Sequence, residues 1–192
     1  MKQCDVVITN PPFSKLNDFI PYVMEHGKEL LLIINMMSLM YKNIFPYAFA
    51  GKFCATSRFS GGATFKRPNG SIAHVHVCGI STMLDLNLPL KWHLYTTQQL
   101  KDKGKFILAD GTQTLECKYI ADIPIDYEDD IFVPISVFLL KIIRKYFDII
   151  RVAKEGVKVN GKIRFHRVVI RKKPNIKPED ILTLKGTNYV KA

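Results

Sequence analysis

Long apolar runs, closely spaced cysteines and glycine-rich loops are all missing from this sequence. The longest apolar stretches, such as residues 30–34 and 133–140, are far shorter than the roughly 20 residues of a membrane-spanning helix. The first residues are polar, and the long apolar core and small-residue cleavage site of a secretory signal do not follow. We therefore expect no membrane association and a cytoplasmic location. The 192 residues, 47% of them hydrophobic, are enough for one core with an appended subdomain.

The cysteine pattern argues against two further classes of protein. The four cysteines lie far apart, with no C-x-x-C pair, at positions Cys4, Cys54, Cys78 and Cys117. A disulfide framework is unusual in an intracellular chain of this size, and zinc ligation requires closer pairing or matched histidines. We predict reduced core thiols. His74 and His76 share one face of a strand but lack acidic or cysteine partners at ligand spacing, so we expect no metal.

A G-x-G motif after an apolar strand is also missing. Gly61 and Gly62 lie in a polar turn, and other glycines are isolated, at Gly104, Gly111, Gly156 and Gly161. Glycine-rich loops allow the backbone to approach a bound nucleotide or cofactor closely. The sequence therefore contains no glycine-rich cofactor loop.

The most informative segment is the tetrapeptide Asn10-Pro11-Pro12-Phe13, which follows an apolar run from residue 6 to residue 9. Proline lacks a backbone donor and fixes its own φ angle, so two in succession end the predicted strand in a stiff, exposed turn. In an open α/β sheet, ligands bind beyond the carboxyl ends of the strands, where this turn would lie. The simplest alternative is a strand and a Pro-Pro turn that perform no chemistry.

The groups on this turn suit an amino group as their ligand. The side-chain carbonyl of Asn10 and the backbone carbonyl of Pro11 are acceptors, and Phe13 offers a flat apolar face. Two converging acceptors would bind both amino protons of an adenine and free the nitrogen lone pair for attack on a methyl sulfonium. No strong general base is then required. The base must first leave the duplex, and stacking on Phe13 would offset part of that cost.

Residues 5–14 resemble the catalytic motif of the amino-methyltransferases that modify adenine in DNA. Later segments resemble, in the same order, the EcoRI-type adenine-specific methyltransferase family: residues 35–46 (NMMSLMYKNIFP), 60–65 (SGGATF), 123–127 (IPIDY), 133–136 (VPIS) and 159–172. The resemblance implies methyl transfer from S-adenosylmethionine to the exocyclic amino group of adenine in DNA, with Asn10, Pro11, Pro12 and Phe13 as the catalytic turn. It also places Asn10 and Phe13 near the methionine end of the cofactor.

One departure from this family is large. The family carries a strand and a glycine-rich S-adenosylmethionine loop upstream of the catalytic turn, whereas nine residues precede Asn10 here. The resemblance therefore implies a fragment that lacks the cofactor-binding lobe. Three alternatives stay open: a non-catalytic nucleic-acid-binding remnant, one subunit of a split methyltransferase completed by another polypeptide, and an enzyme that methylates RNA or a protein glutamine.

Acidic residues are scarce towards the C-terminal end. Residues 1–140 carry 13 Lys and Arg against 13 Asp and Glu, whereas residues 141–192 carry 15 against four. Such a segment suits a polyanion, because each neutralised phosphate releases counterions. Apolar residues interleave with the cations between residues 162 and 170, which favours a strand or hairpin with one basic face. We predict DNA contacts by Lys162, Arg164, Arg167, Arg171, Lys172 and Lys173. The alternative is a solubilising surface.

Strands and helices alternate in the first part of the chain. The pattern predicts a helix at 16–24 with a late start or a kink at Pro21, a buried strand at 29–35, a helix at 42–49, a strand beginning at 52–57, a loop at 60–70 and a strand at 73–81. This order predicts an α/β fold containing part of a doubly wound, Rossmann-like methyltransferase sheet. Lys66 and Arg67 are further candidates for DNA contact, with an ordinary hairpin tip as the alternative.

The second part of the chain is less regular. We predict a short helix at 97–103, a short strand at 113–120 and a helical segment at 131–150. The acidic cluster at 126–130 is interpreted as a solvated loop, and Trp92 as a packing residue. A boundary near residue 83 would separate the catalytic half of a methyltransferase domain (1–83) from a smaller, basic, target-facing α+β region (84–192).

Overall fold

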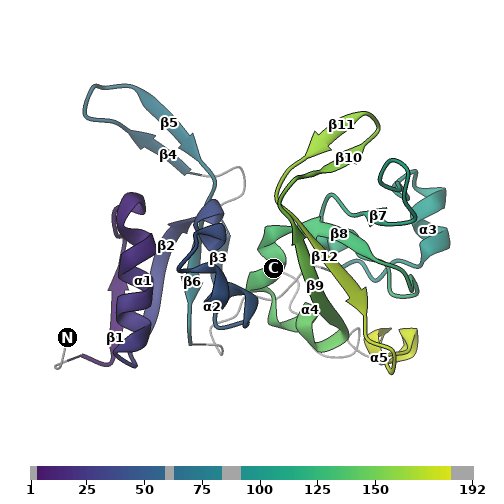
Figure 1. Cartoon of the computed structure of the whole chain (residues 1–192), viewed down its shortest axis with the longest axis horizontal. Coiled ribbons are helices and arrows are strands. Elements are labelled where there is room, and N and C mark those ends of the chain that lie inside the picture. Colours follow the sequence, from purple (N-terminus) through teal and green to yellow (C-terminus); the bar gives the residue numbers. More distant parts are fainter. Residues whose placement is uncertain (1–3, 59–62, 84–91, 183–192) are drawn as a thin grey trace. The chain divides into compact units, whose positions relative to one another are not determined.

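The computed structural model describes residues 4–58, 63–83 and 92–182. The chain forms two compact units (Figure 1): unit 1 comprises Met1–Leu88 and Phe138–Lys141, and unit 2 comprises Pro89–Val137 and Ile142–Ala192. The fold is mixed α/β with several sheets. The functional division expected from the sequence, with a catalytic part up to residue 83 and a target-facing part after it, stays a prediction.

Unit 1 contains a four-stranded sheet in the order β1-β2-β6-β3. Its strands are β1 (Val6–Thr9), β2 (Glu29–Asn35), β6 (Val77–Ser81) and β3 (Cys54–Arg58). β1 and β2 are parallel, whereas β6 is antiparallel to both of its neighbours. The parallel arrangement of a doubly wound sheet therefore ends at β2. The β4–β5 hairpin lies between β3 and β6 in the sequence, and β6 runs antiparallel to β3.

Helix α1 (Leu16–Glu25) connects the two parallel strands. It buries Leu16, Ile20 and Val23, which recur on one helical face. Pro21 lies inside the helix, so the expected late start is wrong: the helix begins five residues before the proline. The proline removes one backbone hydrogen bond, and burial of the apolar face on both sides of it keeps the helix continuous.

The buried strand expected at residues 29–35 is confirmed as β2, in which Leu30, Leu32 and Ile34 are fully buried. It leads into the 3-10 helix η2 (Met36–Met40). The helix expected at 42–49 is shorter, since α2 spans Phe45–Phe49 and the preceding residues form a turn. Proline in the first turn of α2 fixes this late start, because its φ angle suits the beginning of a helix.

The loop expected at residues 60–70 is partly wrong. Strands β4 (Ala63–Lys66) and β5 (Ile72–Val75) form an antiparallel hairpin, while residues 60–62 lie outside the described part of the chain. The hairpin closes in a turn where Asn69 Oδ1 accepts a hydrogen bond from the backbone N–H of Ser71 (3.1 Å). The strand expected at 73–81 is therefore divided at His76 between β5 and β6.

Unit 2 contains a second four-stranded sheet in the order β7-β8-β12-β9. Its strands are β7 (Leu115–Glu116), β8 (Ile131–Pro134), β12 (Arg167–Lys172) and β9 (Phe147–Ala153). Strands β10 (Val157–Val159) and β11 (Lys162–Arg164) form a separate antiparallel hairpin. The helices are α3 (Thr97–Asp102), η4 (Ile120–Asp122), α4 (Lys141–Tyr146) and α5 (Pro178–Leu182).

The helical segment expected at residues 131–150 is wrong for most of its length. It divides into β8, the 3-10 helix η5 (Ile135–Leu139), α4 and the start of β9. Residues 131–133 are buried on both faces of the sheet, and a continuous apolar run of this kind cannot be assigned to a strand or a helix from periodicity alone. Trp92 has the packing role expected, since its ring lies 6.0 Å from that of Phe147 and its Nε1 donates to the carbonyl of Ile123 (2.7 Å).

The described residues contain no helix long and apolar enough to cross a membrane. Within the same residues, no three His, Cys, Asp or Glu side chains gather in a group that could hold a metal ion.

The cysteines give a simple test of this fold. Cys54, Cys78 and Cys117 are buried, whereas Cys4 is exposed, so the core assignment is wrong for Cys4. Burial raises the pKa of Cys78 to about 12 and raises the pKa of Cys117 still further, so neither forms the reactive thiolate near neutral pH. We expect one thiol to react with Ellman's reagent in the native protein at pH 8 and four in urea. Rapid native reaction of a second thiol would contradict this fold.

Candidate functional site

The tetrapeptide lies at the carboxyl end of β1. Asn10 is exposed, and no hydrogen bond to its side chain occurs within the described residues, so its amide is available to a ligand. Pro11 is buried and Pro12 is exposed. The carbonyl of Pro12 accepts a hydrogen bond from the backbone N–H of Lys15 (2.9 Å), which starts the 3-10 helix η1 (Phe13–Lys15) and leads directly into α1. The turn is therefore held between the edge strand β1 and helix α1, whose apolar face is buried in the core.

The carboxyl ends of two parallel strands meet at this edge of the sheet. Thr9, the last residue of β1, lies opposite Leu32 of β2, and β2 continues to Asn35. Asn35 Oδ1 accepts a hydrogen bond from the backbone N–H of Met37 (3.0 Å) and caps η2. An edge of this kind is where ligands bind in open α/β sheets.

Phe13 has an aromatic neighbour from a distant part of the sequence. Its ring is half-buried and lies 6.2 Å from that of Phe65 in β4, at an interplanar angle of 84°. This edge-to-face geometry is a favourable one for aromatic pairs. Phe65 lies on the half-buried face of the β4–β5 hairpin, which Figure 1 shows reaching above the start of α1. The aromatic pair of Phe13 and Phe65 therefore forms an apolar surface next to Asn10 and Pro11, the residues expected to supply the two acceptors.

Lys66 and Arg67 lie farther along the same hairpin, at its tip. Lys66 is exposed at the end of β4. The side chain of Arg67 is exposed and its Nη1 donates to Ser71 Oγ at 3.4 Å. Both positions are open to solvent, and their role in DNA contact stays a prediction.

Strand β1 forms the edge of its sheet, with an apolar surface that is open to solvent. It pairs with β2 on one side, and Val6 and Ile8 are 36% and 70% exposed. Edge strands of soluble proteins are normally covered, charged or shortened, because an open edge pairs with other chains. Among the described residues, this edge beside the turn at residues 10–13 is therefore open to pairing with a further strand.

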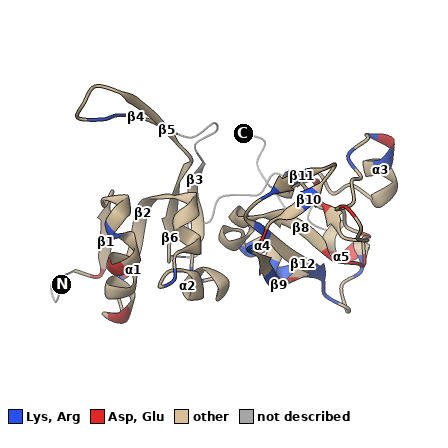
Figure 2. Cartoon of the chain, turned by 45° about the horizontal axis from the view of Figure 1, so that its top comes forward, with Lys and Arg blue, Asp and Glu red and all other residues tan. Residues whose placement is uncertain are grey.

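The six C-terminal candidates for DNA contact occupy different environments. Figure 2 shows lysine and arginine concentrated on β9, β11 and β12 of unit 2. Lys162 and Arg164 of β11 are exposed, and neither has an acidic partner among the described residues. The other four are engaged inside unit 2: Arg167, Arg171, Lys172 and Lys173.

Three of those four cations pair with a carboxylate, and the fourth donates to a backbone carbonyl. Arg167 is paired with Glu116 and Arg171 with Asp130. Lys172 is buried and paired with Glu128. Lys173 donates to the carbonyl of Arg144 at 2.8 Å.

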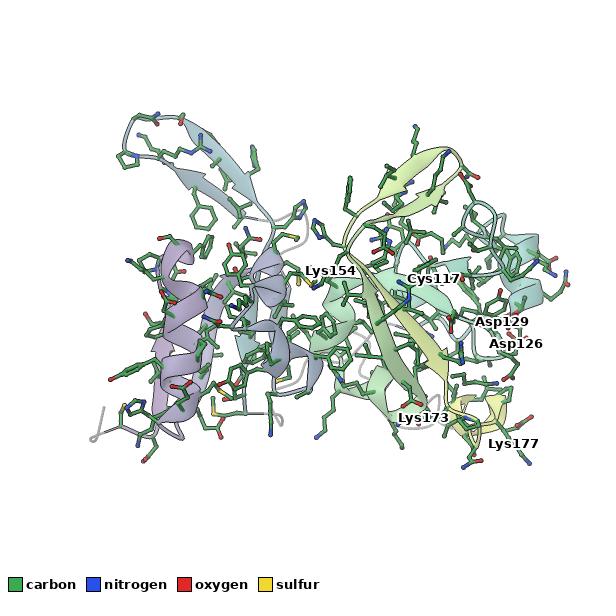
Figure 3. All side chains as sticks on the ribbon, in the orientation of Figure 1. Cys117, Asp126, Asp129, Lys154, Lys173 and Lys177 are labelled. Carbon is green, nitrogen blue, oxygen red and sulfur yellow. The ribbon has the colours of Figure 1, made fainter. Side chains whose placement is uncertain are left out.

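The acidic loop at 126–130 accounts for two of these pairs. It lies beside β8, and Figure 3 labels its Asp126 and Asp129 on unit 2 together with Lys173 just after β12. The antiparallel register of β8 and β12 places Ile170 opposite Ile131, so that Arg171 meets Asp130 at 2.7 Å. This pairing raises the pKa of Arg171. The opposite charges of residues 128–130 and 171–172 could have indicated from the sequence that these two segments pair, although no such pairing was predicted.

Comparison with known proteins adds to this geometry. A family model described as the adenine-specific methyltransferase EcoRI matches residues 1–191. The chain is 26% identical over 193 residues to the Type II methyltransferase M.EcoRI of Escherichia coli, an alignment that covers 90% of this chain and 59% of that protein.

Two mycoplasma proteins are similar to the same extent. The Type II methyltransferases M.MgeORF184P of Mycoplasma genitalium and M.MpnI of Mycoplasma pneumoniae are each 26% identical, over 90% and 92% of this chain and 66% of their own length. The chain thus spans less than two thirds of these curated relatives. No solved structure matches it. The chain belongs to the EcoRI-type family of adenine-specific methyltransferases, since the family model covers nearly its whole length.

Proposed function

We propose that this chain carries the catalytic and target-facing parts of an adenine-specific DNA methyltransferase that uses S-adenosylmethionine. The observation that supports this most is the catalytic turn itself. Asn10 is exposed at the carboxyl end of β1, next to a half-buried Phe13 that packs on Phe65. The Type II designation of the relatives favours DNA methylation of the restriction-modification kind, carried out in the cytoplasm.

The proposed chemistry uses groups on one turn. Asn10 Oδ1 and the Pro11 carbonyl accept hydrogen bonds from the two amino protons of a flipped adenine, and the purine stacks on Phe13. These contacts favour a tetrahedral nitrogen whose lone pair points away from the ring, so the gain is electrostatic and positional. S-adenosylmethionine would supply the methyl group, whose bond to sulfur would be replaced by a bond to the nitrogen. The proton lost from the nitrogen passes to solvent.

The sheet of unit 1 fits half of a Rossmann-like methyltransferase sheet. Parallel β1 and β2 are joined through α1. A strand of the cofactor-binding lobe would pair with the open edge of β1, and other parts of that lobe would cover the exposed side chains of Val6 and Ile8. Within the described residues, Asn10 and Phe13 fit only the reactive end of the cofactor. We infer that a polypeptide outside these 192 residues supplies the lobe, either as part of the same protein or as a partner.

The target-facing part would hold DNA through cations that have no internal partner. Lys162 and Arg164 have no acidic partner among the described residues, and the catalytic part adds Lys66 and Arg67, which are open to solvent at the tip of the β4–β5 hairpin. Arg167, Arg171, Lys172 and Lys173 have internal partners, and we assign them a structural role in addition to any phosphate contact. Exposed cations bind phosphate by releasing condensed counterions, so this binding should weaken steeply with salt.

The test combines cofactor binding with transfer. In calorimetric titration, S-adenosylmethionine should give no saturable heat with the chain alone, and saturable heat after addition of the polypeptide encoded immediately upstream. The completed protein should then transfer a labelled methyl group to DNA, and digestion should yield N6-methyladenine.

Other outcomes separate the alternatives. Label in cytosine, RNA or protein would overturn adenine specificity. Salt-sensitive DNA binding without transfer, from the completed protein, would favour a non-catalytic remnant. Saturable binding to the chain alone would show that the cofactor site is built from these 192 residues and that no separate lobe is needed.

A further inference from the structure

The hairpin of β10 and β11 presents two large apolar side chains to solvent. Ile163 is 58% exposed and Phe165 is 57% exposed, and both belong to a segment that also carries Lys162 and Arg164. Exposed apolar side chains between unpaired cations are unusual on a surface that only has to be soluble. Figure 1 shows this hairpin projecting from the main sheet of unit 2.

The two apolar side chains lie together over a glycine. A Cβ atom built on Gly156 would be 2.6 Å from Ile163 Cγ2 and 3.2 Å from Phe165 Cδ1, so both side chains cover the position where a larger residue would project. Residues two apart on a strand share a face, as do residues directly opposite in an antiparallel pair. Lys158, which lies opposite Ile163, is therefore on the same outward face.

The other face of β10 anchors the hairpin. Val157 and Val159 are buried in a cluster with Ala109, Phe132, Ala153 and Val169. The tip is held by one carboxylate: Asp110 accepts hydrogen bonds from the backbone N–H groups of Asn160 (2.8 Å) and Gly161 (2.9 Å). These two residues have positive φ angles of 49° and 75°, which suits an Asn-Gly hairpin turn. The apolar pair is therefore presented on a preformed support.

The charges of this hairpin favour a polyanion over a protein partner. Lys158 lies on the face of the apolar pair, whereas Lys162 and Arg164 lie opposite Val159 and Val157, on the other face. Lys158, Lys162 and Arg164 have no acidic partner among the described residues. Two acids that adjoin the hairpin are already engaged: Glu155, just before β10, pairs with Arg151, and Asp110 accepts hydrogen bonds from the hairpin tip. Aromatic side chains next to cations bind the exposed faces of bases, while the cations hold the phosphates.

We propose that the β10–β11 hairpin binds unstacked DNA bases, with Phe165 as the stacking side chain and Ile163 beside it. This inference rests on the proposed function, in which a target base leaves the duplex. It assigns Lys158, which shares the face of the apolar pair, to the nearest phosphate, and Lys162 and Arg164, on the other face of β11, to phosphates that pass the edge of the hairpin. The hairpin would then bind DNA in which a base has left the stack, and fully paired DNA offers no such base.

The experiment measures equilibrium binding of the full chain to fluorescein-labelled DNA by anisotropy. One probe is a paired duplex and the other is the same duplex with a single bulged adenine. Phe165→Ala should weaken binding to the bulged duplex about tenfold, within the range for one stacked base, and change binding to the paired duplex much less. The matched control is Tyr119→Ala, which removes an exposed aromatic (56%) from unit 2 outside the hairpin and should change neither affinity.

Two further variants separate stacking from charge and from packing. Phe165→Trp should retain the affinity, whereas Phe165→Leu should lose most of it despite preserving apolar bulk. Phe165→Ala should leave the slope of log affinity against log salt unchanged, whereas Lys162→Ala or Arg164→Ala should make that slope less steep by about 0.9.

Three results would overturn the proposal. They are equal losses for Phe165→Ala and Tyr119→Ala, an equal loss on both duplexes, and a change in oligomeric state without a change in DNA binding. A wild-type chain that binds neither duplex would remove the proposed DNA function itself, and with it this role for the hairpin.

Discussion

Asn10→Ala should lower the rate of methyl transfer about 10²- to 10³-fold, the range found when one preorganised polar group is removed from a transition state. The variant keeps the Pro11 carbonyl and the stacking face of Phe13 but loses one of the two acceptors for the amino protons. The loss should fall on the single-turnover rate constant and leave DNA affinity almost unchanged, because the acceptor acts on one amino group of a large ligand. The measurement is transfer of labelled methyl to DNA in the presence of the cofactor-binding lobe.

Stability supplies the control for this experiment. Asn10 is exposed and its side chain has no hydrogen bond within the described residues, so the substitution should change the free energy of unfolding by less than about 0.5 kcal/mol. Asn10→Asp keeps an acceptor oxygen and should retain more activity than Asn10→Ala. If Asn10→Ala transfers methyl within threefold of the wild-type rate, the tetrapeptide is only a strand followed by a stiff turn.

The turn at residues 10–13 could be located from sequence because its information is local, while its catalytic role stays a prediction. Two prolines end a strand whatever surrounds them, and the chemistry of an Asn side chain and a Phe ring does not depend on the fold. The same applies to β2, whose continuous apolar run at residues 30–34 has the length of a strand. The contact between Phe13 and Phe65 could not be located, because more than fifty residues separate them and their meeting depends on the β4–β5 hairpin.

The segment at residues 131–150 shows a second limit. Its apolar residues fit helical spacing, yet Ile131, Phe132 and Val133 are central in a sheet and buried on both faces. Burial on both faces removes the alternation by which a strand is recognised, so that pairing with β12 decides the outcome. The sequence of residues 131–150 alone does not contain this information, because β12 lies outside that segment.

Charge gives a third limit. The excess of cations after residue 140 is a property of composition, but pairing in space determines which of them are available. Sheet register brings Arg171 to Asp130, while Lys172 reaches Glu128. Lys162 and Arg164 of the β10–β11 hairpin are exposed and have no acidic partner in the part of the chain that the structure describes. Cations that were equally good candidates for phosphate contact in the sequence therefore differ in the fold in whether an acidic side chain already pairs with them.

Arg167→Ala should destabilise unit 2 by about 3–5 kcal/mol, the cost of leaving one member of a buried ion pair unpaired. Arg167 Nε and Nη2 both lie 2.8 Å from Oε1 of Glu116, and the two side chains are 13% and 5% exposed. Oε2 of Glu116 is buried and has no hydrogen-bond partner among the described residues, so loss of the arginine would leave the whole carboxylate unpaired in the interior. Trp92, the single tryptophan, packs on Tyr146 and Phe147 within unit 2, and its fluorescence reports the unfolding of this unit in urea.

The control for this prediction lies one strand earlier. Arg164→Ala removes an exposed arginine with no acidic partner among the described residues and should change stability by less than about 0.5 kcal/mol, while it weakens DNA binding. Replacing Glu116 and Arg167 together with methionine should recover most of the stability, because it removes both charges and keeps their volume. If Arg167→Ala unfolds at the same urea concentration as wild type but binds DNA weakly, Arg167 acts as a phosphate contact and the ion pair is dispensable. The expected opposite result would separate the structural arginines of β12 from the binding cations of β11.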